Sequence, residues 1–178
     1  MELGVISVRY ARALLKHATN MSVETLVYQD MQSLYDCYLE MAELRSTIDN
    51  PMLSKDKKEQ LLVTACGMNA SEATLSFIRL VLKEGREKAL QFMAASYITL
   101  YRKQKNITYG KLSTATVVAP AVEQKMRQLV ENRTLGTVEF NTEVNPNIIG
   151  GFILEYDTYR MDASVRTRLS SILSQLKQ

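Results

Sequence analysis

The chain has 178 residues, 46% of them hydrophobic, and its 22 basic and 19 acidic residues give a net charge of +3. This length allows one large or two small globular domains, and the ordinary composition excludes a disordered or collagen-like chain. The small, mixed charge does not indicate nucleic acid binding, and the lack of a signal-peptide pattern or of an apolar run of about 18 residues predicts a soluble, untargeted protein.

The first predicted helix, residues 3–18, carries two apolar stripes instead of one. The first stripe consists of Val8, Ala11, Leu15 and Ala18. The second stripe consists of Leu3, Ile6, Tyr10, Ala13 and Leu14. Since a surface helix needs only one buried face, the second stripe indicates either a bound partner helix or a position in the middle of a bundle.

The next segments also have helical periodicity. Ser22 is the predicted N-cap of a long helix that runs to about Arg45, and Asn50-Pro51 ends a short helical turn after it. Ser54 is the predicted N-cap of a further helix, which Gly67 ends.

A second unusual helix follows, because six of the eight residues from Leu75 to Leu82 are apolar. Such a helix is buried on most sides. Asn69, with Glu72 three positions later, predicts its start as a capping-box-like pair, and Gly85 ends it. With a last helix at 87–105, residues 1–105 are expected to form a domain of five or six helices.

Around Asn106 the period of the apolar pattern changes from helical to alternating, which predicts a domain boundary. Strands are expected at 107–118, 138–144 and 148–156, with a helix from Pro120 between the first two. Gly150-Gly151 inside the third strand indicates a bulge or a close backbone approach. After a reversal at Asp157-Thr158, a short strand precedes the last helix, so residues 106–178 are predicted to be a β-α-β-β-(β)-α domain and the chain belongs to the α+β class.

The last helix is predicted to begin at Asp162, whose carboxylate would accept the first backbone N–H groups. Its apolar residues recur at helical spacing on one stripe. They are Val165, Leu169, Ile172, Leu173 and Leu176. Arg166 and Arg168 lie off this stripe.

No nucleotide-binding motif is present. Gly110-Lys111 would need Gly in place of Lys105 and Ser or Thr in place of Leu112 to complete a phosphate-binding loop. Gly150-Gly151 does not have the spacing of a dinucleotide site. No cofactor is therefore expected.

No catalytic or metal-binding set is present either. His17 is the only histidine and has neither a second metal ligand nor a nucleophile to activate. Asp157 and Asp162 are interpreted as a turn residue and a helix cap. Cys37 and Cys66 both lie in apolar helical patterns, which favours buried free thiols in a reducing compartment. The chain is not expected to be an enzyme.

Two segments of the chain resemble one family. The run Ile148–Phe152, followed by Asp162–Arg166 and then Arg168-Leu169, resembles the signature of the delta subunit of the F-type ATP synthase, the oligomycin-sensitivity-conferring protein of mitochondria. Ala163 stands where many members have Gly, a small-for-small change. Residues 9–14 resemble the opening motif of the same family. The signature residues are Gly150, Gly151, Phe152, Asp162, Ser164, Arg166 and Leu169.

The resemblance implies a non-catalytic stator subunit, a monomer within a larger complex that is peripheral on the cytoplasmic face of a bacterial inner membrane. It also implies a groove between the first and fifth helices for the N-terminal helix of an alpha subunit, and a C-terminal site for the b-subunit stalk, which we expect on the helix after Asp162. The resemblance carries over at Tyr10 and Leu80, and helical geometry extends the alpha-subunit site around them. The expected site residues are Leu3, Ile6, Tyr10, Ala13, Leu14, Phe77, Leu80 and Val81.

The alternative is RNA binding. The order β-α-β-β-α resembles an RNA-recognition fold, and Gly151-Phe152-Ile153 is similar to the end of its aromatic motif. Gly150 and Glu155, however, occupy positions where that motif has aromatic residues. RNA binding is therefore the second choice.

Overall fold

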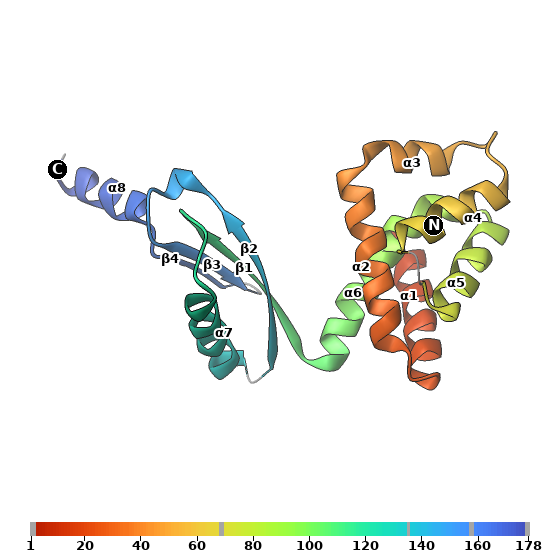
Figure 1. Ribbon diagram of the computed structural model, residues 1–178, viewed down its shortest axis with the longest axis horizontal. Helices are drawn as coiled ribbons and strands as arrows, with labels where there is room; N and C mark the ends of the chain where they lie inside the picture. Colours follow the sequence, from red (N-terminus) through yellow and green to blue (C-terminus); the bar gives the residue numbers. More distant parts are fainter. Residues whose placement is uncertain (1–2, 68–69, 135, 157–158, 177–178) are drawn as a thin grey trace. The chain divides into compact units, whose positions relative to one another are not determined.

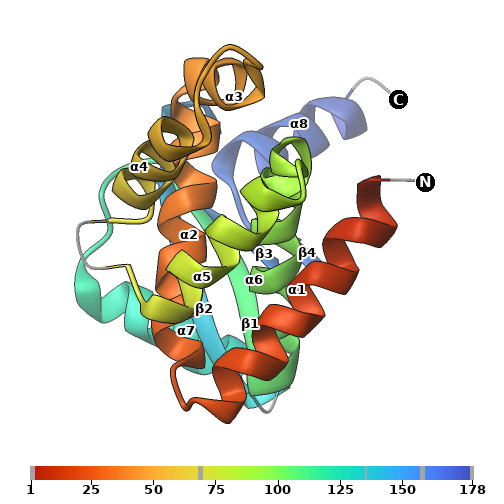
Figure 2. The ribbon, with the colours of Figure 1, turned by 90° about the vertical axis from the view of Figure 1, so that its right-hand side faces the viewer.

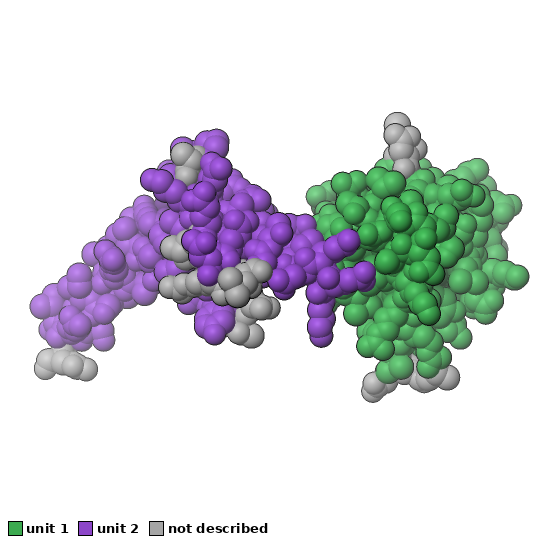
Figure 3. Space-filling model, turned by 90° about the horizontal axis from the view of Figure 1, so that it is seen from below, with its two compact units in different colours: residues 1–101 green, residues 102–178 purple. Residues whose placement is uncertain are grey.

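The computed structural model describes residues 3–67, 70–134, 136–156 and 159–176 (Figure 1). Contacts divide the chain into two compact units, residues 1–101 (unit 1) and 102–178 (unit 2), shown in green and purple in Figure 3. The α+β class is confirmed.

Unit 1 is a helical bundle. Its described elements are α1 (Leu3–Asn20), α2 (Glu24–Glu40), α3 (Ala42–Asp49), α4 (Lys55–Ala65), α5 (Glu72–Lys83), the 3-10 turn η1 (Glu87–Ala89) and α6 (Leu90–Lys105), whose end extends into unit 2. The core is filled by fully buried side chains from several helices, including Met31, Leu62, Ile78, Leu90 and Tyr97. On α5, Phe77, Ile78, Val81 and Leu82 are all buried on one face, whereas Ser76, Arg79, Leu80 and Lys83 are exposed on the other. The prediction that this helix is buried on most sides is therefore wrong, because only one face packs in the bundle.

Several predicted helix boundaries in unit 1 are wrong. The chain leaves the helical region at Met41 (φ −114°, ψ 89°), so the predicted long helix is split into α2 and α3. Ser22 is not the N-cap of α2. It has a φ of +55° in the preceding turn, and Val23 stands at the cap without a side-chain hydrogen bond. Gly67 and Gly85 have positive φ after α4 and α5, as expected for residues that end helices.

A buried carboxylate determines where α5 starts. Ser71 is the N-cap, and its hydroxyl accepts a hydrogen bond from the Thr74 N–H at 3.3 Å. Asp30 of α2, 8% exposed, accepts hydrogen bonds from the Ser71 N–H, the Ser71 hydroxyl and the Thr74 hydroxyl at 2.7–2.9 Å. The capping pair predicted at Asn69 and Glu72 is therefore replaced by a cap from Ser71 and Asp30, and Asn69 lies outside the described residues.

Unit 2 is built on a four-stranded mixed sheet in the order β2-β1-β3-β4. Its described elements are β1 (Ile107–Thr114), α7 (Pro120–Thr134), β2 (Thr137–Val144), the 3-10 turn η2 (Pro146–Ile148), β3 (Phe152–Tyr156), β4 (Tyr159–Asp162) and α8 (Val165–Leu176). β1 and β2 are parallel, which requires a crossover, and α7 provides it. The β1–β3 and β3–β4 pairs are antiparallel. The third strand, β3, begins at Phe152, four residues later than the predicted start at Ile148.

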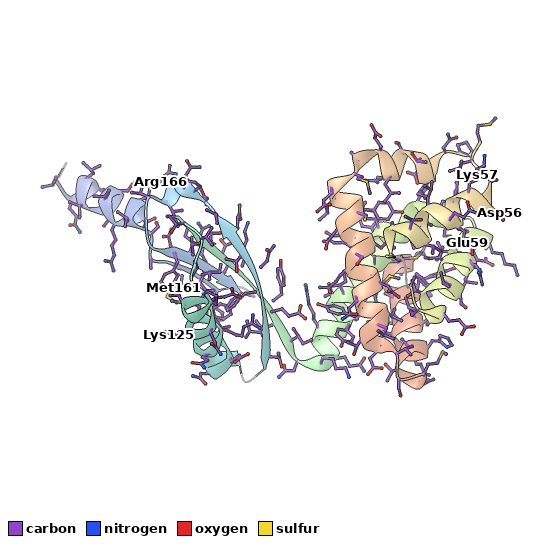
Figure 4. All side chains as sticks on the ribbon, in the orientation of Figure 1. Asp56, Lys57, Glu59, Lys125, Met161 and Arg166 are labelled. Atoms are coloured by element: carbon purple, nitrogen blue, oxygen red, sulfur yellow. The ribbon has the colours of Figure 1, made fainter. Side chains whose placement is uncertain are left out.

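The core of unit 2 lies between the sheet and α7. Leu112, Val138 and Leu154 of the sheet are buried together with Val130 of α7. Met161 of β4 packs against the same cluster, and Figure 4 shows its place beside α7. Because side chains alternate along a strand, the odd-numbered positions of β1 and β3 lie on the opposite face of the sheet.

This opposite face carries several charged side chains, and Tyr109 of β1 is its one exposed aromatic residue among the described positions of the two central strands. Lys111 pairs with Glu143, and Arg160 pairs with Glu155 at 3.3 Å. An RNA-recognition sheet needs aromatic side chains on its central strands for the bases to stack on. Here Ile153 and Glu155 occupy β3, so the structural basis for RNA binding is missing there.

Candidate functional site

The two glycines of the signature contact the start of α8. Gly151 has a φ of +77°, and a β-carbon added to it would lie 2.3 Å from the carbonyl oxygen of Ala163. A β-carbon on Gly150 would meet the Val165 side chain at 3.0 Å. The predicted close backbone approach is therefore present, whereas the alternative of a bulge is wrong because the pair precedes β3.

Asp162 and Ser164 together hold the first turn of α8. The Ser164 hydroxyl accepts a hydrogen bond from the Thr167 N–H at 3.2 Å, which makes Ser164 the N-cap instead of Asp162. The Asp162 carboxylate accepts hydrogen bonds from the Ser164 N–H and the Thr167 hydroxyl, both at 2.9 Å. The hydrogen bonds from Ser164 and then Thr167 lower the pKa of the Asp162 carboxyl. Asp162 therefore supports the cap from the end of β4.

The remaining signature residues have separate positions. Phe152 begins β3 and packs, half-buried, against the core of unit 2. Arg166, labelled in Figure 4, and Leu169 are exposed on α8. The signature thus comprises an anchor, made of the glycines, Asp162 and Ser164, one residue packed against the core, Phe152, and two residues of the anchored helix.

The apolar stripe of α8 is uncovered. α8 packs on η2, and Figure 1 shows it extending away from the sheet. The five side chains of the stripe are between 38% and 78% exposed. Arg166 and Arg168 are exposed beside them, and 165–176 contains no acidic residue. We call Val165, Leu169, Ile172, Leu173 and Leu176 the α8 stripe.

A second partly apolar surface lies on unit 1, where α1 and α5 pack against each other (Figure 2). Ile6 and Tyr10 of α1 are half-buried, Ala13 is exposed, and Leu80 of α5 is 48% exposed. We call Ile6, Tyr10, Ala13 and Leu80 the α1–α5 surface. Figure 2 shows both helices on the face of unit 1 that is turned to the viewer.

Tyr10 connects the two helices. Its ring meets the edge of Phe77, with centroids 6.4 Å apart, and the Arg86 guanidinium lies 5.4 Å from the ring centroid. Arg86, which follows α5, was not among the sequence candidates. No periodicity argument identifies it, because it lies outside a helix.

Three of the eight predicted alpha-subunit site residues belong to the bundle core. Leu14 is 4% exposed, Phe77 is 7% exposed and Val81 is fully buried. These side chains have almost no surface to offer a partner, so their assignment is corrected. The side chain of Leu3 lies outside the described residues. Of the other predicted stripe on α1, Ala11, Leu15 and Ala18 are buried as expected, and Val8 is half-buried.

The described residues do not form an obvious reaction centre. His17 is exposed on α1. Within the described ranges, no three His, Cys, Asp or Glu side chains are grouped so that they could hold a metal ion. No described helix has both the length and the hydropathy required to cross a bilayer.

The chain is similar over nearly its full length to proteins of one family. A family model described as ATP synthase delta (OSCP) subunit matches residues 6–176. The chain is 47% identical to an ATP synthase subunit delta of Phocaeicola vulgatus, over 98% of this chain and 95% of that protein, and 40% identical to one of Bacteroides fragilis, over 98% and 95%. It also resembles a chain in the mitochondrial ATP synthase hexamer of Toxoplasma gondii, with a TM-score of 0.68 and 24% identity over 97% of both chains. That last likeness concerns the fold.

Proposed function

We propose that this chain, which belongs to the ATP synthase delta (OSCP) subunit family, binds two partners. As a member of that family it is a non-catalytic stator subunit of an F-type ATP synthase. The N-terminal helix of an alpha subunit binds the α1–α5 surface. The C-terminal end of the b-subunit stalk binds the α8 stripe. The chain thereby ties the catalytic head to the stalk, so that the head resists the torque of the rotor while proton flow is coupled to ATP synthesis.

The observation that carries the stalk half of this proposal is the uncovered α8 stripe. Leaving five large apolar side chains half exposed on one helix is unfavourable, and covering the exposed part of each contributes roughly 1 kcal/mol. A contiguous apolar stripe with polar flanks is the surface that an amphipathic helix recognises. The stalk end is therefore expected to present a matching apolar stripe with acidic residues next to Arg166 and Arg168.

The α1–α5 surface supports the alpha-subunit site. Leu80 is exposed on α5 although its neighbours Phe77 and Val81 face the core. Tyr10 is fixed by Phe77 and Arg86, and a fixed aromatic side chain is a favourable anchor because little rotamer freedom is lost on binding. Ile6 and Ala13 extend the apolar surface along α1.

We further propose that residues 1–105 and 106–178 are separate domains and that the whole subunit is peripheral on the cytoplasmic face of the bacterial membrane. α6 ends at Lys105 and β1 begins at Ile107, so a boundary near Asn106 leaves both elements intact. The fragment 1–105 is expected to fold alone and to bind the alpha-subunit helix. An unfolded fragment would show that the boundary is misplaced.

A two-partner titration tests the proposal. One peptide carries the alpha-subunit N-terminal sequence and the other the C-terminal sequence of the b subunit, and sedimentation velocity measures the complexes that form with the intact chain. We expect a 1:1:1 complex in which each peptide binds with the same affinity whether or not the other is present. Competition between the peptides would mean that they share one surface, which contradicts the proposal.

A further inference from the structure

Unit 1 contains a pocket that is open to the surface and shares no lining residue with the α1–α5 surface; we call it the α2–α3–α4 cavity. It lies where α2 ends, α3 begins and the later part of α4 passes, and its volume is about 630 Å3. Figures 1 and 2 both show α4 below α3 in this part of the bundle. The cavity exists because the chain leaves the helix at Met41, so that α3 does not continue the line of α2.

The walls of the cavity are mainly apolar. Met41, Leu44 and Leu61 contribute large side chains, and Met41 and Leu61 are 50% and 40% exposed. A volume of this size lies in the range of small-molecule sites, roughly 300–1,000 Å3. Met is also an adaptable side chain that fits ligands of different shapes. The cavity can therefore receive the apolar body of a small molecule.

The charged groups of the cavity have one sign. Glu40, at the end of α2, and Glu43, in the first turn of α3, line it, and none of the lining residues in the described part of the chain is basic. The donor hydrogens of the two threonine hydroxyls of the lining are already used, since Thr47 donates to the Glu43 carbonyl and Thr64 donates to the Gln60 carbonyl, and these hydroxyls carry no charge. The two carboxylates, both exposed at the rim, are thus the charged groups that would orient a ligand.

From this combination we infer that the α2–α3–α4 cavity binds an organic cation with an apolar body, such as an alkylammonium or arylalkylammonium compound. The apolar body lies against Met41, Leu44 and Leu61, and the positive charge lies next to Glu40 and Glu43. This binding site is independent of the proposed alpha-subunit and stalk sites. It adds a small-molecule site to a subunit whose proposed partners are polypeptides.

The reactivity of the Cys37 thiol can be used to measure binding at this site. Cys37 lines the cavity, and its thiol donates to the Ala65 carbonyl oxygen at 3.5 Å. The second thiol, Cys66, is 4% exposed, and burial raises its pKa to about 12. Since the thiolate is the reactive species, an alkylating reagent should modify Cys37 much faster than Cys66. Bound ligand should slow the modification of Cys37.

The experiment measures the rate of Cys37 alkylation by iodoacetamide on the intact chain, using intact-protein mass spectrometry. Cys37→Ser and Cys66→Ser variants assign the modified thiol. Three probes with the same ten-carbon tail are added below their micelle thresholds: decyltrimethylammonium, decyl maltoside and decyl sulfate. We expect saturable protection by the cation at roughly millimolar concentration, weaker protection by the neutral probe and the weakest by the sulfate.

Variants separate the charge from the cavity. Glu40→Gln with Glu43→Gln should weaken cation binding by roughly three- to thirtyfold and leave the neutral probe unchanged. The matched control, Glu72→Gln with Glu84→Gln, changes two exposed carboxylates that do not line the cavity and should have no effect. Leu61→Ser should weaken the binding of all three probes. Circular dichroism checks that this variant remains folded.

The inference is wrong if no probe protects Cys37 saturably, or if the sulfate protects it as well as the cation. It is also wrong if the control pair weakens the cation as much as the cavity pair does. Binding of the alpha-subunit peptide, titrated with and without the cation, should be unchanged. That titration distinguishes failure of this site from failure of the proposed stator contacts.

Discussion

The backbone N–H of Val165, the first residue of α8, donates to the carbonyl oxygen of Gly150 at 2.9 Å. A second bond, from the Ala163 N–H to the Phe152 carbonyl, runs beside it at 2.9 Å. α8 is thus attached at its first turn to the chain that leads into β3, while its apolar stripe stays exposed. The signature residues fix a helix that is free to bind along its length.

The first prediction concerns Gly151. Gly151→Val places a β-branched side chain at a φ of +77° and its β-carbon against the Ala163 carbonyl. The strained backbone alone costs about 1–3 kcal/mol, and the clash adds to this. Chemical denaturation should show a less stable unit 2, and stalk binding should weaken with it. Gly4→Ala, in α1 of unit 1 at a glycine with nothing within 4 Å, is the control and should leave the stability of unit 2 unchanged.

Binding of the alpha-subunit peptide should survive Gly151→Val. The mutated residue belongs to unit 2, whereas the α1–α5 surface belongs to unit 1. Loss of both binding activities in this variant would show that the two units depend on one core.

The second prediction concerns the α8 stripe. Leu169→Asp with Leu173→Asp should abolish stalk binding, because two carboxylates would have to be desolvated in an apolar contact. Since the two side chains are 48% and 57% exposed, the thermal melting temperature should change little. The control pair Ser171→Asp with Ser174→Asp adds the same charge off the stripe and should retain binding in a pull-down with the b-subunit peptide. If both double variants lose stalk binding equally, the added negative charge, and not the α8 stripe, is the cause.

The third prediction concerns Leu80. Leu80→Asp should weaken binding of the alpha-subunit peptide by roughly thirtyfold or more, which corresponds to about 2 kcal/mol for an apolar anchor. Leu26→Asp is the matched control, because Leu26 is 53% exposed on α2 and lies outside the α1–α5 surface. Both variants should melt close to the parent. Tyr10→Asp is less informative alone, since Tyr10 also contacts Phe77 within the protein.

The fourth prediction concerns a buried ion pair in unit 1. Lys58, 4% exposed, lies 2.8 Å from Glu87, whose second carboxylate oxygen is buried without a hydrogen-bond partner. Burial raises the pKa of Glu87, but the hydrogen bond and charge of Lys58 outweigh it, and the net pKa is lowered. A carboxyl whose pKa is lower in the folded state stabilises that state above its unfolded pKa, and this stability is lost as the pH falls through the folded value.

Urea denaturation at a series of pH values below about 5 should therefore show a steeper loss of stability for the parent than for Glu87→Gln. At neutral pH, Glu87→Gln should cost roughly 3 kcal/mol, because Lys58 would stay buried without its counter-ion. Glu59→Gln, which breaks the more exposed pair with Arg79, should cost less than about 1 kcal/mol. If the free energy of unfolding depends on pH in the same way for the parent and for Glu87→Gln, the lowered pKa of Glu87 does not contribute to stability.

The sequence predicted the parts of the fold that depend on periodicity. The apolar spacing located α1, α5 and α8, and it showed that α1 has more apolar surface than the core uses. The apolar spacing assigned Leu14 to the partner-facing stripe, although Leu14 is buried in the core. The two stripes of α1 share an edge, and residues at that edge are i+3 or i+4 neighbours of both stripes. Only the packing against the rest of the bundle decides which edge residues are buried.

The features that sequence rules missed depend on distant contacts. Asp30 caps α5 from 41 residues away, as the hydrogen bond to the Ser71 N–H shows. Ile149 was predicted to lie in a strand because it is β-branched, yet its φ is +69°, a region that such residues rarely adopt. The cavity near Met41 likewise follows from a break that no Gly or Pro marks.

Isothermal titration calorimetry with the alpha-subunit N-terminal peptide measures whether the α1–α5 surface binds an alpha-subunit helix. We expect one peptide per chain, a negative heat-capacity change from apolar burial and an affinity that changes little between low and high salt. Leu80→Asp should reduce this affinity, and Leu26→Asp should not. An absence of heat at concentrations that detect micromolar binding, or binding that Leu80→Asp leaves unchanged, would contradict the account.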